Sequence, residues 1–90
     1  FGHAGNGNIH VNLMIDPKDE QQVQNAAPCL EDIFDLVISL DGSLSGEHGI
    51  GLDKKRFMTK QLDSATLDIM RSIKKQFDPK GILNPGKILP

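Results

Sequence analysis

A change of hydrophobic period between residues 9 and 40 places the strongest constraint on the fold. Apolar residues alternate with other residues in IHVNLMI at positions 9–15, which predicts a strand with one buried face. From Glu20 to Leu40 apolar residues recur at helical spacing, and Pro28 either kinks this helix or begins it. The strand rises ~20 Å and the helix returns ~30 Å. The segment after the helix is therefore predicted to lie near the start of the strand.

The remaining elements are set by caps and turn residues. Gly42 is predicted to end the first helix in the left-handed conformation, and a short strand is expected near Ser43–Ser45. Asp63 or Ser64 is predicted to cap a second helix, which stops before Pro79. The tail GILNPGKILP is turn-rich and is expected to lie against a surface without forming an element.

These elements give an α+β or α/β class with a small core of one or two strands under two helices. Such a core is thin for independent stability. The chain also opens directly on a glycine-rich stretch without a starting Met. We therefore expect a segment of a larger layered domain within a longer polypeptide, which we call the parent protein.

Composition excludes several classes of function. The net charge of −2, the few aromatic residues and the absence of a basic stripe argue against nucleic acid as the main partner. No apolar run approaches the ~18 residues of a membrane span, and no signal core opens the chain. Cys29 is the only cysteine, which excludes an internal disulfide and fits a reducing cytoplasm, the location that we expect. The apolar neighbours of Cys29 predict a small core residue.

Histidines and one glutamate are the candidate site residues. Glycines between His3 and His10 allow the chain to double back, and the strand-out, helix-back path brings Glu47 and His48 to the same end. Two imidazoles and one carboxylate form a catalytic metal set with open positions. The alternative is a group of ordinary polar loop residues. A phosphate cradle is disfavoured, because GNGNIH lacks a third glycine and GEHGIG lacks a Lys-Ser/Thr pair.

Three stretches then resemble one family in family order. GHAGNGNIHVN, GSLSGEHGIG and FDPKGILNPGKILP resemble the motifs of the C-terminal part of FAD-linked oxidases of the vanillyl-alcohol oxidase type. The resemblance covers nearly the whole chain, and it is strongest to members that act on glycolate, D-lactate and D-2-hydroxyglutarate. It implies oxidation of a D-2-hydroxy acid to a 2-oxo acid with hydride transfer to FAD.

The resemblance also implies a role for individual residues. The positions implied to bind a divalent ion, most often zinc, are His3, His10 and Glu47. The other implied roles are general base for His48, a place near the substrate for Asn12 and a place near the flavin for Asn84.

The chain departs from the family motifs at two positions and lacks one domain of the family. Asn6 stands where the family has aspartate, and Asp41 stands where it has the first glycine of a pair. The loss of the aspartate removes an anion that could support the metal histidines. FAD is bound in the family mainly by an N-terminal domain that this chain lacks. The chain would then be the last portion of a ferredoxin-like substrate (cap) domain, inactive alone, whose partners are the FAD-binding domain of the parent protein and other oxidase subunits.

Two further interpretations stay open on the sequence. The first is a metal- or ligand-binding or assembly module that keeps the fold without catalysis, and Asn6 favours it. The second, a relative of flavin-dependent ether-lipid synthases, is weaker because Glu47-His48 replaces the expected run of histidines. Lys54, Lys55 and Arg56 either face an anionic substrate or form a solvated charge run. Any membrane association would come through partner subunits.

Overall fold

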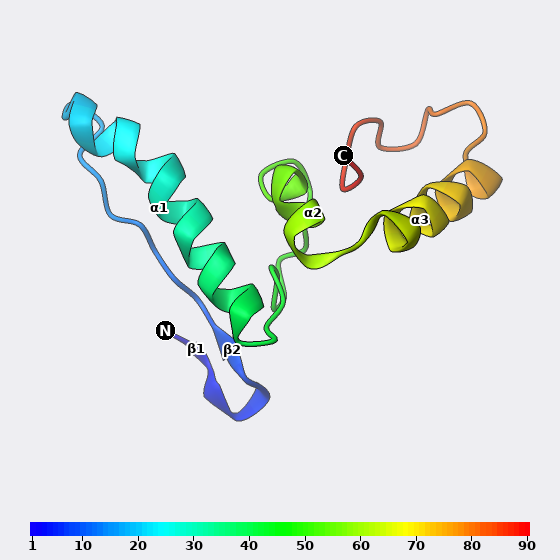
Figure 1. The fold of residues 1–90 in the computed structure, drawn as a ribbon. Coiled ribbons are helices and arrows are strands. Elements are labelled where there is room, and N and C mark those ends of the chain that lie inside the picture. The colour runs from blue at the N-terminus through cyan, green and yellow to red at the C-terminus, as the bar shows by residue number, and fades with distance from the viewer. The chain divides into compact units, whose positions relative to one another are not determined.

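The computed structural model of the protein describes residues 1–90 and divides them into two units, residues 1–48 and residues 49–90. Figure 1 labels the helices and strands. The combination of a two-stranded sheet with helices confirms the α+β class, and the ferredoxin-like arrangement stays a prediction.

The first unit opens with a small hairpin. Strand β1 (Gly2–His3) and strand β2 (Asn8–Ile9) are antiparallel, with Gly2 opposite Ile9 and His3 opposite Asn8. The 3-10 helix η1 (Ala4–Asn6) joins them. Gly7, at φ 70°, donates its N–H to the carbonyl of Ala4 at 3.0 Å. This left-handed glycine reverses the chain, as the sequence predicts.

The predicted strand at 9–15 is wrong in its extent. β2 ends at Ile9, and the chain continues to Asp16 as an extended segment outside any sheet. Its apolar side chains are exposed, among them Val11 at 57% and Met14 at 89%. The alternation of apolar residues with other residues suits one face of a sheet. A strand also requires a neighbouring strand that pairs with its backbone N–H and C=O groups. The short strand predicted near Ser43–Ser45 is absent for the same reason.

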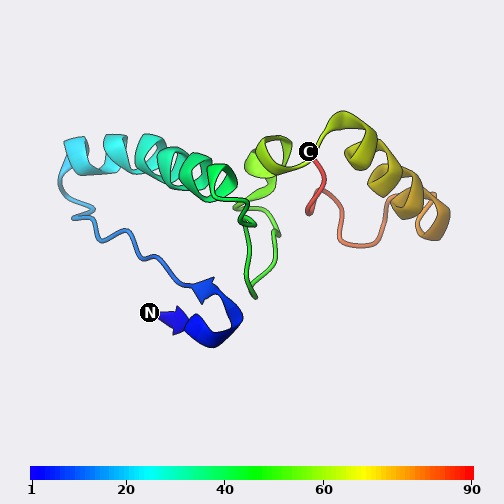
Figure 2. The same ribbon diagram turned by 60° about the horizontal axis from the view of Figure 1, so that its bottom comes forward.

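Helix α1 (Glu20–Ser39) has nearly the predicted bounds. Asp19 caps it, because its Oδ1 accepts the N–H groups of Gln21 at 3.0 Å and Gln22 at 3.3 Å. Pro28 lies inside the helix and does not begin it. Figures 1 and 2 show the extended segment leading from β2 to the start of α1, and α1 returning.

The predicted C-terminal cap of α1 is displaced by one residue. Asp41, at φ 59°, adopts the left-handed conformation, and Gly42 does not. Gly42 donates its N–H to the carbonyl of Val37 at 2.8 Å, and a Cβ there would lie 2.9 Å from that oxygen. The glycine is needed for this close approach, so a side chain would break the turn.

The second unit is built around α3 (Ser64–Phe77), preceded by η2 (Lys55–Phe57) and α2 (Met58–Gln61). The Asp63 side chain accepts the N–H of Thr66 at 2.8 Å, which confirms Asp63 as the cap. Hydrogen bonding from the Thr66 side chain, and then from the Thr66 N–H, lowers the pKa of Asp63 below its ordinary value of 3.8. The helix ends at Phe77, as predicted.

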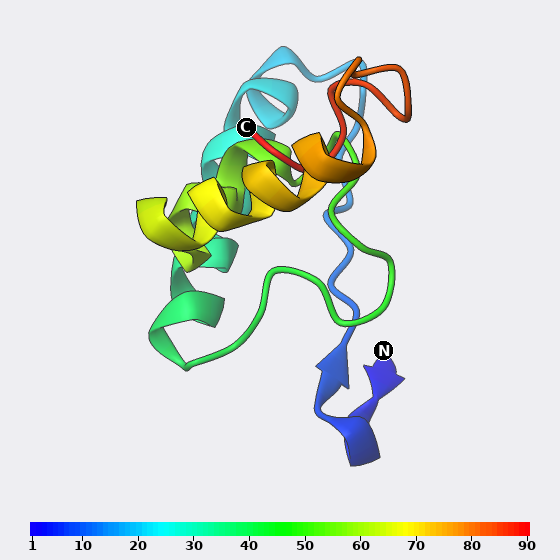
Figure 3. The ribbon, with the colours of Figure 1, turned by 90° about the vertical axis from the view of Figure 1, so that its right-hand side faces the viewer.

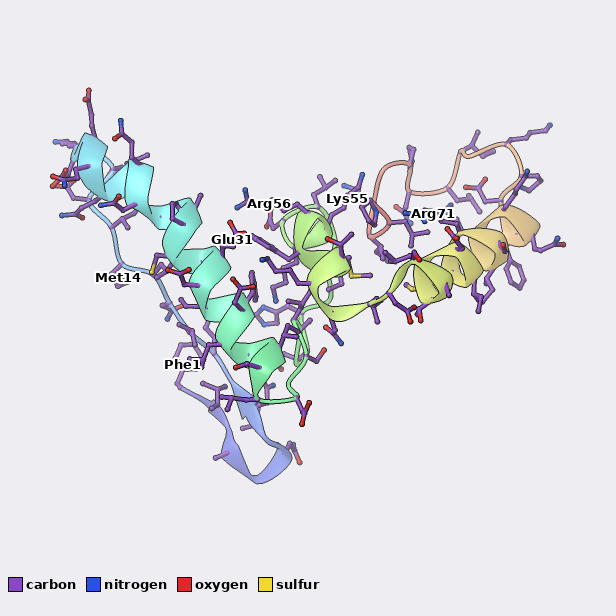
Figure 4. All side chains as sticks on the ribbon, viewed as in Figure 1. Phe1, Met14, Glu31, Lys55, Arg56 and Arg71 are labelled. Carbon is purple, nitrogen blue, oxygen red and sulfur yellow. The ribbon has the colours of Figure 1, made fainter.

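The tail after α3 forms no regular element, as predicted, and folds back on its own unit (Figure 3). Lys55 Nζ donates to the carbonyl of Gly86 at 3.0 Å, and an Arg71 guanidinium nitrogen donates to that of Pro90 at 3.1 Å. Figure 4 labels both side chains. The N–H of Ile88 also donates to the carbonyl of Gly51 at 2.8 Å.

The buried apolar side chains are few. They are Phe34 and Leu44 in the first unit, and Phe57, Met58 and Leu67 in the second. The prediction for Cys29 is wrong: its side chain is exposed, because it lies beside the stripe of α1 that contains Leu30 and Phe34. None of the helices has the length and apolar character required to cross a membrane.

Candidate functional site

The hairpin holds the first two histidines. His3 ends β1, and His10 follows β2 directly. The N–H of His10 donates to the carbonyl of Phe1, and the rings of Phe1 and His10 stack with centroids 4.5 Å apart and planes 10° apart. The antiparallel hairpin thus returns His10 to the start of the chain, whereas a straight chain would separate His3 from His10 by ~23 Å.

The loop after α1 brings the other two candidates to the hairpin. His3 Nε2 lies 3.9 Å from Glu47 Oε2, and His48 Nε2 lies 4.0 Å from Glu47 Oε1. The rings of His10 and His48 meet edge to face, with centroids 5.4 Å apart. The prediction that the strand-out, helix-back path brings these four residues to one end is therefore confirmed. We call them the histidine cluster.

Two glycines lie where other segments approach closely, Gly46 against the side chain of Asn8 and Gly2 against the backbone of Asn8. A Cβ on Gly46 would lie 2.3 Å from Oδ1 of Asn8, so the SGEHG loop touches the hairpin at this point. A Cβ on Gly2 would lie 2.2 Å from the carbonyl oxygen of Asn8. Sequence reasoning missed Phe1, Asn8 and Gly46. The sequence did offer one signal for Gly46, its place directly before Glu47, because a loop needs glycine where another segment of the chain packs closely against it.

The cluster is open to solvent. The side chains of His3 and His48 are 65% and 64% exposed, and that of Glu47 is 47% exposed. Ion pairs at this exposure contribute little to stability, because water and salt screen them. The ion pairs of the cluster therefore add little to the free energy of folding.

The donors fit a divalent ion only in part. Two ligands of one zinc ion, each ~2.1 Å from it, lie at most ~4.2 Å apart, and His3 and Glu47 meet that limit at 3.9 Å. His10 instead stacks on Phe1, and no group of three His, Cys, Asp or Glu side chains is arranged to hold a metal ion. A metal centre is therefore not among the features that the structure supports.

The other candidate residues lie outside the cluster. Asn12 is exposed in the extended segment after His10. Asn84 is exposed in the tail of the second unit at φ 44°. Asn6, which departs from the family pattern, lies in η1 at the tip of the hairpin. Asp41, the other departure, holds the left-handed conformation at φ 59° that a glycine would adopt more readily.

Comparison with known proteins identifies a family for almost the whole chain. Residues 1–88 match the family described as "FAD linked oxidases, C-terminal domain". The mitochondrial D-lactate dehydrogenase [cytochrome] of Arabidopsis thaliana is 41% identical over 90 residues, which are 100% of this chain and 16% of that protein. No solved structure matches the chain.

Two bacterial relatives show similar likeness. The glycolate oxidase subunit GlcD of Bacillus subtilis is 38% identical over 88 residues, 98% of this chain and 19% of that protein. The D-2-hydroxyglutarate dehydrogenase of Stutzerimonas stutzeri is 37% identical over 90 residues, again 98% of this chain and 19% of the relative. The chain thus spans less than a fifth of the length of these relatives.

Proposed function

The chain belongs to the family of C-terminal domains of FAD-linked oxidases, and on that premise we propose that it is the C-terminal catalytic segment of an FAD-dependent D-2-hydroxy-acid dehydrogenase or oxidase. Relatives named for D-lactate, glycolate and D-2-hydroxyglutarate support this substrate class. The parent protein oxidises a 2-hydroxy acid to a 2-oxo acid, and this segment alone is inactive. FAD, held mainly by the FAD-binding domain of the parent protein, accepts the hydride.

The observation that carries the proposal is the contact of His48 with Glu47 and with the ring of His10. Loss of hydride from C2 of a hydroxy acid requires removal of the hydroxyl proton. A neutral imidazole suits this role near pH 7, so His48 takes the proton as general base. The imidazolium that forms lies 4.0 Å from Glu47, and the attraction of opposite charges stabilises it.

The remaining residues bind and orient. Asn12 contacts the substrate with its amide, and Asn84 lies near the flavin in the assembled protein. We also propose His3, His10 and Glu47 as ligands of a divalent ion, for which zinc suits the imidazole and carboxylate donors. His3 and Glu47 already lie within reach of one ion, whereas His10 would have to leave the ring of Phe1 to complete the set. Location in the cytoplasm, with membrane contact only through other oxidase subunits, is part of the same proposal.

The test is anaerobic reduction of the flavin in the full-length parent protein. Glycolate and the D forms of lactate and 2-hydroxyglutarate are added separately, with the L forms of the latter two as matched controls. We expect one of these acids to bleach the visible flavin band. A flavin-loaded protein that none of them reduces would contradict the substrate class.

A second candidate function is a binding or assembly module without catalysis. Asn6, which departs from the family pattern, favours it. The two functions differ in what the parent protein contains. An upstream FAD-binding domain that retains flavin through purification favours the enzyme, whereas a parent protein without flavin favours the module.

A further inference from the structure

Asp78 is the one charged side chain that the structure buries, with 3% of its side chain exposed. It directly follows α3 and accepts three donors. Lys74 Nζ donates to Oδ2, the N–H of Ile82 donates to Oδ1 at 3.0 Å, and the N–H of Leu83 donates to Oδ2 at 3.0 Å. A buried carboxylate is costly without such partners, so this set fixes the turn from residue 78 to residue 83.

Lys74 completes the arrangement from the last turn of α3. Its Nζ donates to the carbonyl oxygen of Leu83 at 2.6 Å as well as to Asp78. Both backbone polar groups of Leu83 are therefore held by this pair of side chains. The carbonyl belongs to the peptide bond between Leu83 and Asn84, so Lys74 fixes the peptide plane that leads directly into Asn84.

The same helix offers a contrast. Asp68 and Arg71 also form an ion pair, at 2.8 Å, but the Asp68 side chain is 72% exposed and accepts no tail N–H. An exposed pair of this kind contributes little to stability, and Arg71 meets the tail at Pro90 and not at Asn84. At Asp78 the hydrogen bond from Lys74 lowers the pKa and outweighs burial, which raises it. The carboxylate stays ionised and retains its donors.

We propose that Lys74 and Asp78 are positioning residues that fix the Leu83–Asn84 peptide and thereby orient Asn84 toward the flavin. This inference rests on the proposed function, which places Asn84 near the cofactor. The pair acts through Leu83 and touches neither substrate nor cofactor. The tail has no regular element of its own, so its conformation depends on such side-chain contacts.

The test uses the full-length, FAD-loaded parent protein. Asn84→Ala reports the effect of removing the amide, and Asp78→Asn and Lys74→Met break the positioning pair. Asp68→Asn is the matched control on the same helix. We expect Asn84→Ala to shift the flavin absorption band and to slow flavin reduction about tenfold to a hundredfold. Asp78→Asn and Lys74→Met should reproduce most of both effects, whereas Asp68→Asn should produce neither.

The double variant separates positioning from mere stability. If the pair acts through Asn84, adding Asp78→Asn to Asn84→Ala leaves the rate of Asn84→Ala nearly unchanged. Additive losses, or a Lys74→Met protein with the normal band and rate while Asn84→Ala has lost them, would overturn the proposal. Lys74→Met leaves the carboxylate with both backbone donors, so it carries the test if Asp78→Asn fails to fold.

Failure of the proposed function has a different signature. If Asn84→Ala changes neither the flavin band nor the rate in a protein that still oxidises its substrate, Asn84 does not lie near the flavin. The positioning role of Lys74 and Asp78 is then refuted as well. A parent protein that binds no flavin refutes the proposed function itself.

Discussion

Replacing Gly2 with alanine tests whether the hairpin positions the histidine cluster. The new Cβ would lie 2.2 Å from the carbonyl oxygen of Asn8 and 2.9 Å from Cα of Ile9, whereas ordinary contact begins at 3.4 Å. Both neighbours are backbone atoms, which cannot rotate away. β1 and β2 must therefore separate by about 1 Å, which displaces His3 from Glu47. Overpacking of this kind costs about 1–3 kcal/mol.

The assay is substrate-driven flavin reduction in the full-length parent protein, with thermal unfolding of the same samples. A displacement of about 1 Å in a catalytic group lowers the rate by up to about a hundredfold. Gly5→Ala is the matched control, because a Cβ at Gly5 meets no atom within 4 Å. If Gly2→Ala and Gly5→Ala reduce their flavin at the same rate and unfold at the same temperature, the hairpin does not position the site.

Three further predictions concern caps, pH and metal. Asp19→Ala should destabilise the protein by about 1 kcal/mol, measured by denaturant unfolding, because α1 loses the acceptor for Gln21 and Gln22; an unchanged midpoint would refute the cap. The pKa values of Asp63 and Asp78 are lowered from 3.8, so both ionised carboxylates stabilise the folded state above that pH. This stabilisation is lost as the pH falls through the lowered pKa values. The denaturant midpoint of unfolding should therefore decrease in that acidic range, and it should decrease less steeply for Asp78→Asn. Metal analysis without chelator should find a divalent ion in the full-length protein and much less in His10→Ala; equal, negligible amounts would refute the three-residue set.

The sequence predicted the path of the first unit better than its strands. The start and end of a helix depend on local residues, so Asp63 and Pro79 revealed the bounds of α3. The apolar spacing from Glu20 revealed α1, whereas its cap at Asp19 was found only in the structure. The approach of Glu47 to His3 and of His48 to His10 followed from the lengths of the segments between them. The strand at 9–15 did not form, because strand pairing depends on a neighbouring backbone that no local pattern reveals.

Contacts between distant residues were also beyond the sequence. The stacking of Phe1 on His10 arises only when the hairpin forms, and the packing of Gly46 on Asn8 arises only when the loop meets the hairpin. The Lys74–Asp78 pair lies at ordinary helical spacing, and nothing local shows that it also holds Leu83. Asp41 was an anomaly in the motif, and its left-handed conformation explains why glycine suits that position.

The central claim, that His48 is the general base, is tested most directly by stopped-flow flavin reduction in the full-length His48→Ala variant. General base catalysis contributes about 10²–10⁴-fold, so reduction should slow by that factor while flavin content stays normal. Metal content should also stay normal, because Glu47 and not His48 is the proposed ligand, and Glu47→Ala serves as the comparison that loses metal and activity together. A His48→Ala protein that reduces its flavin at the parent rate would show that another group takes the proton.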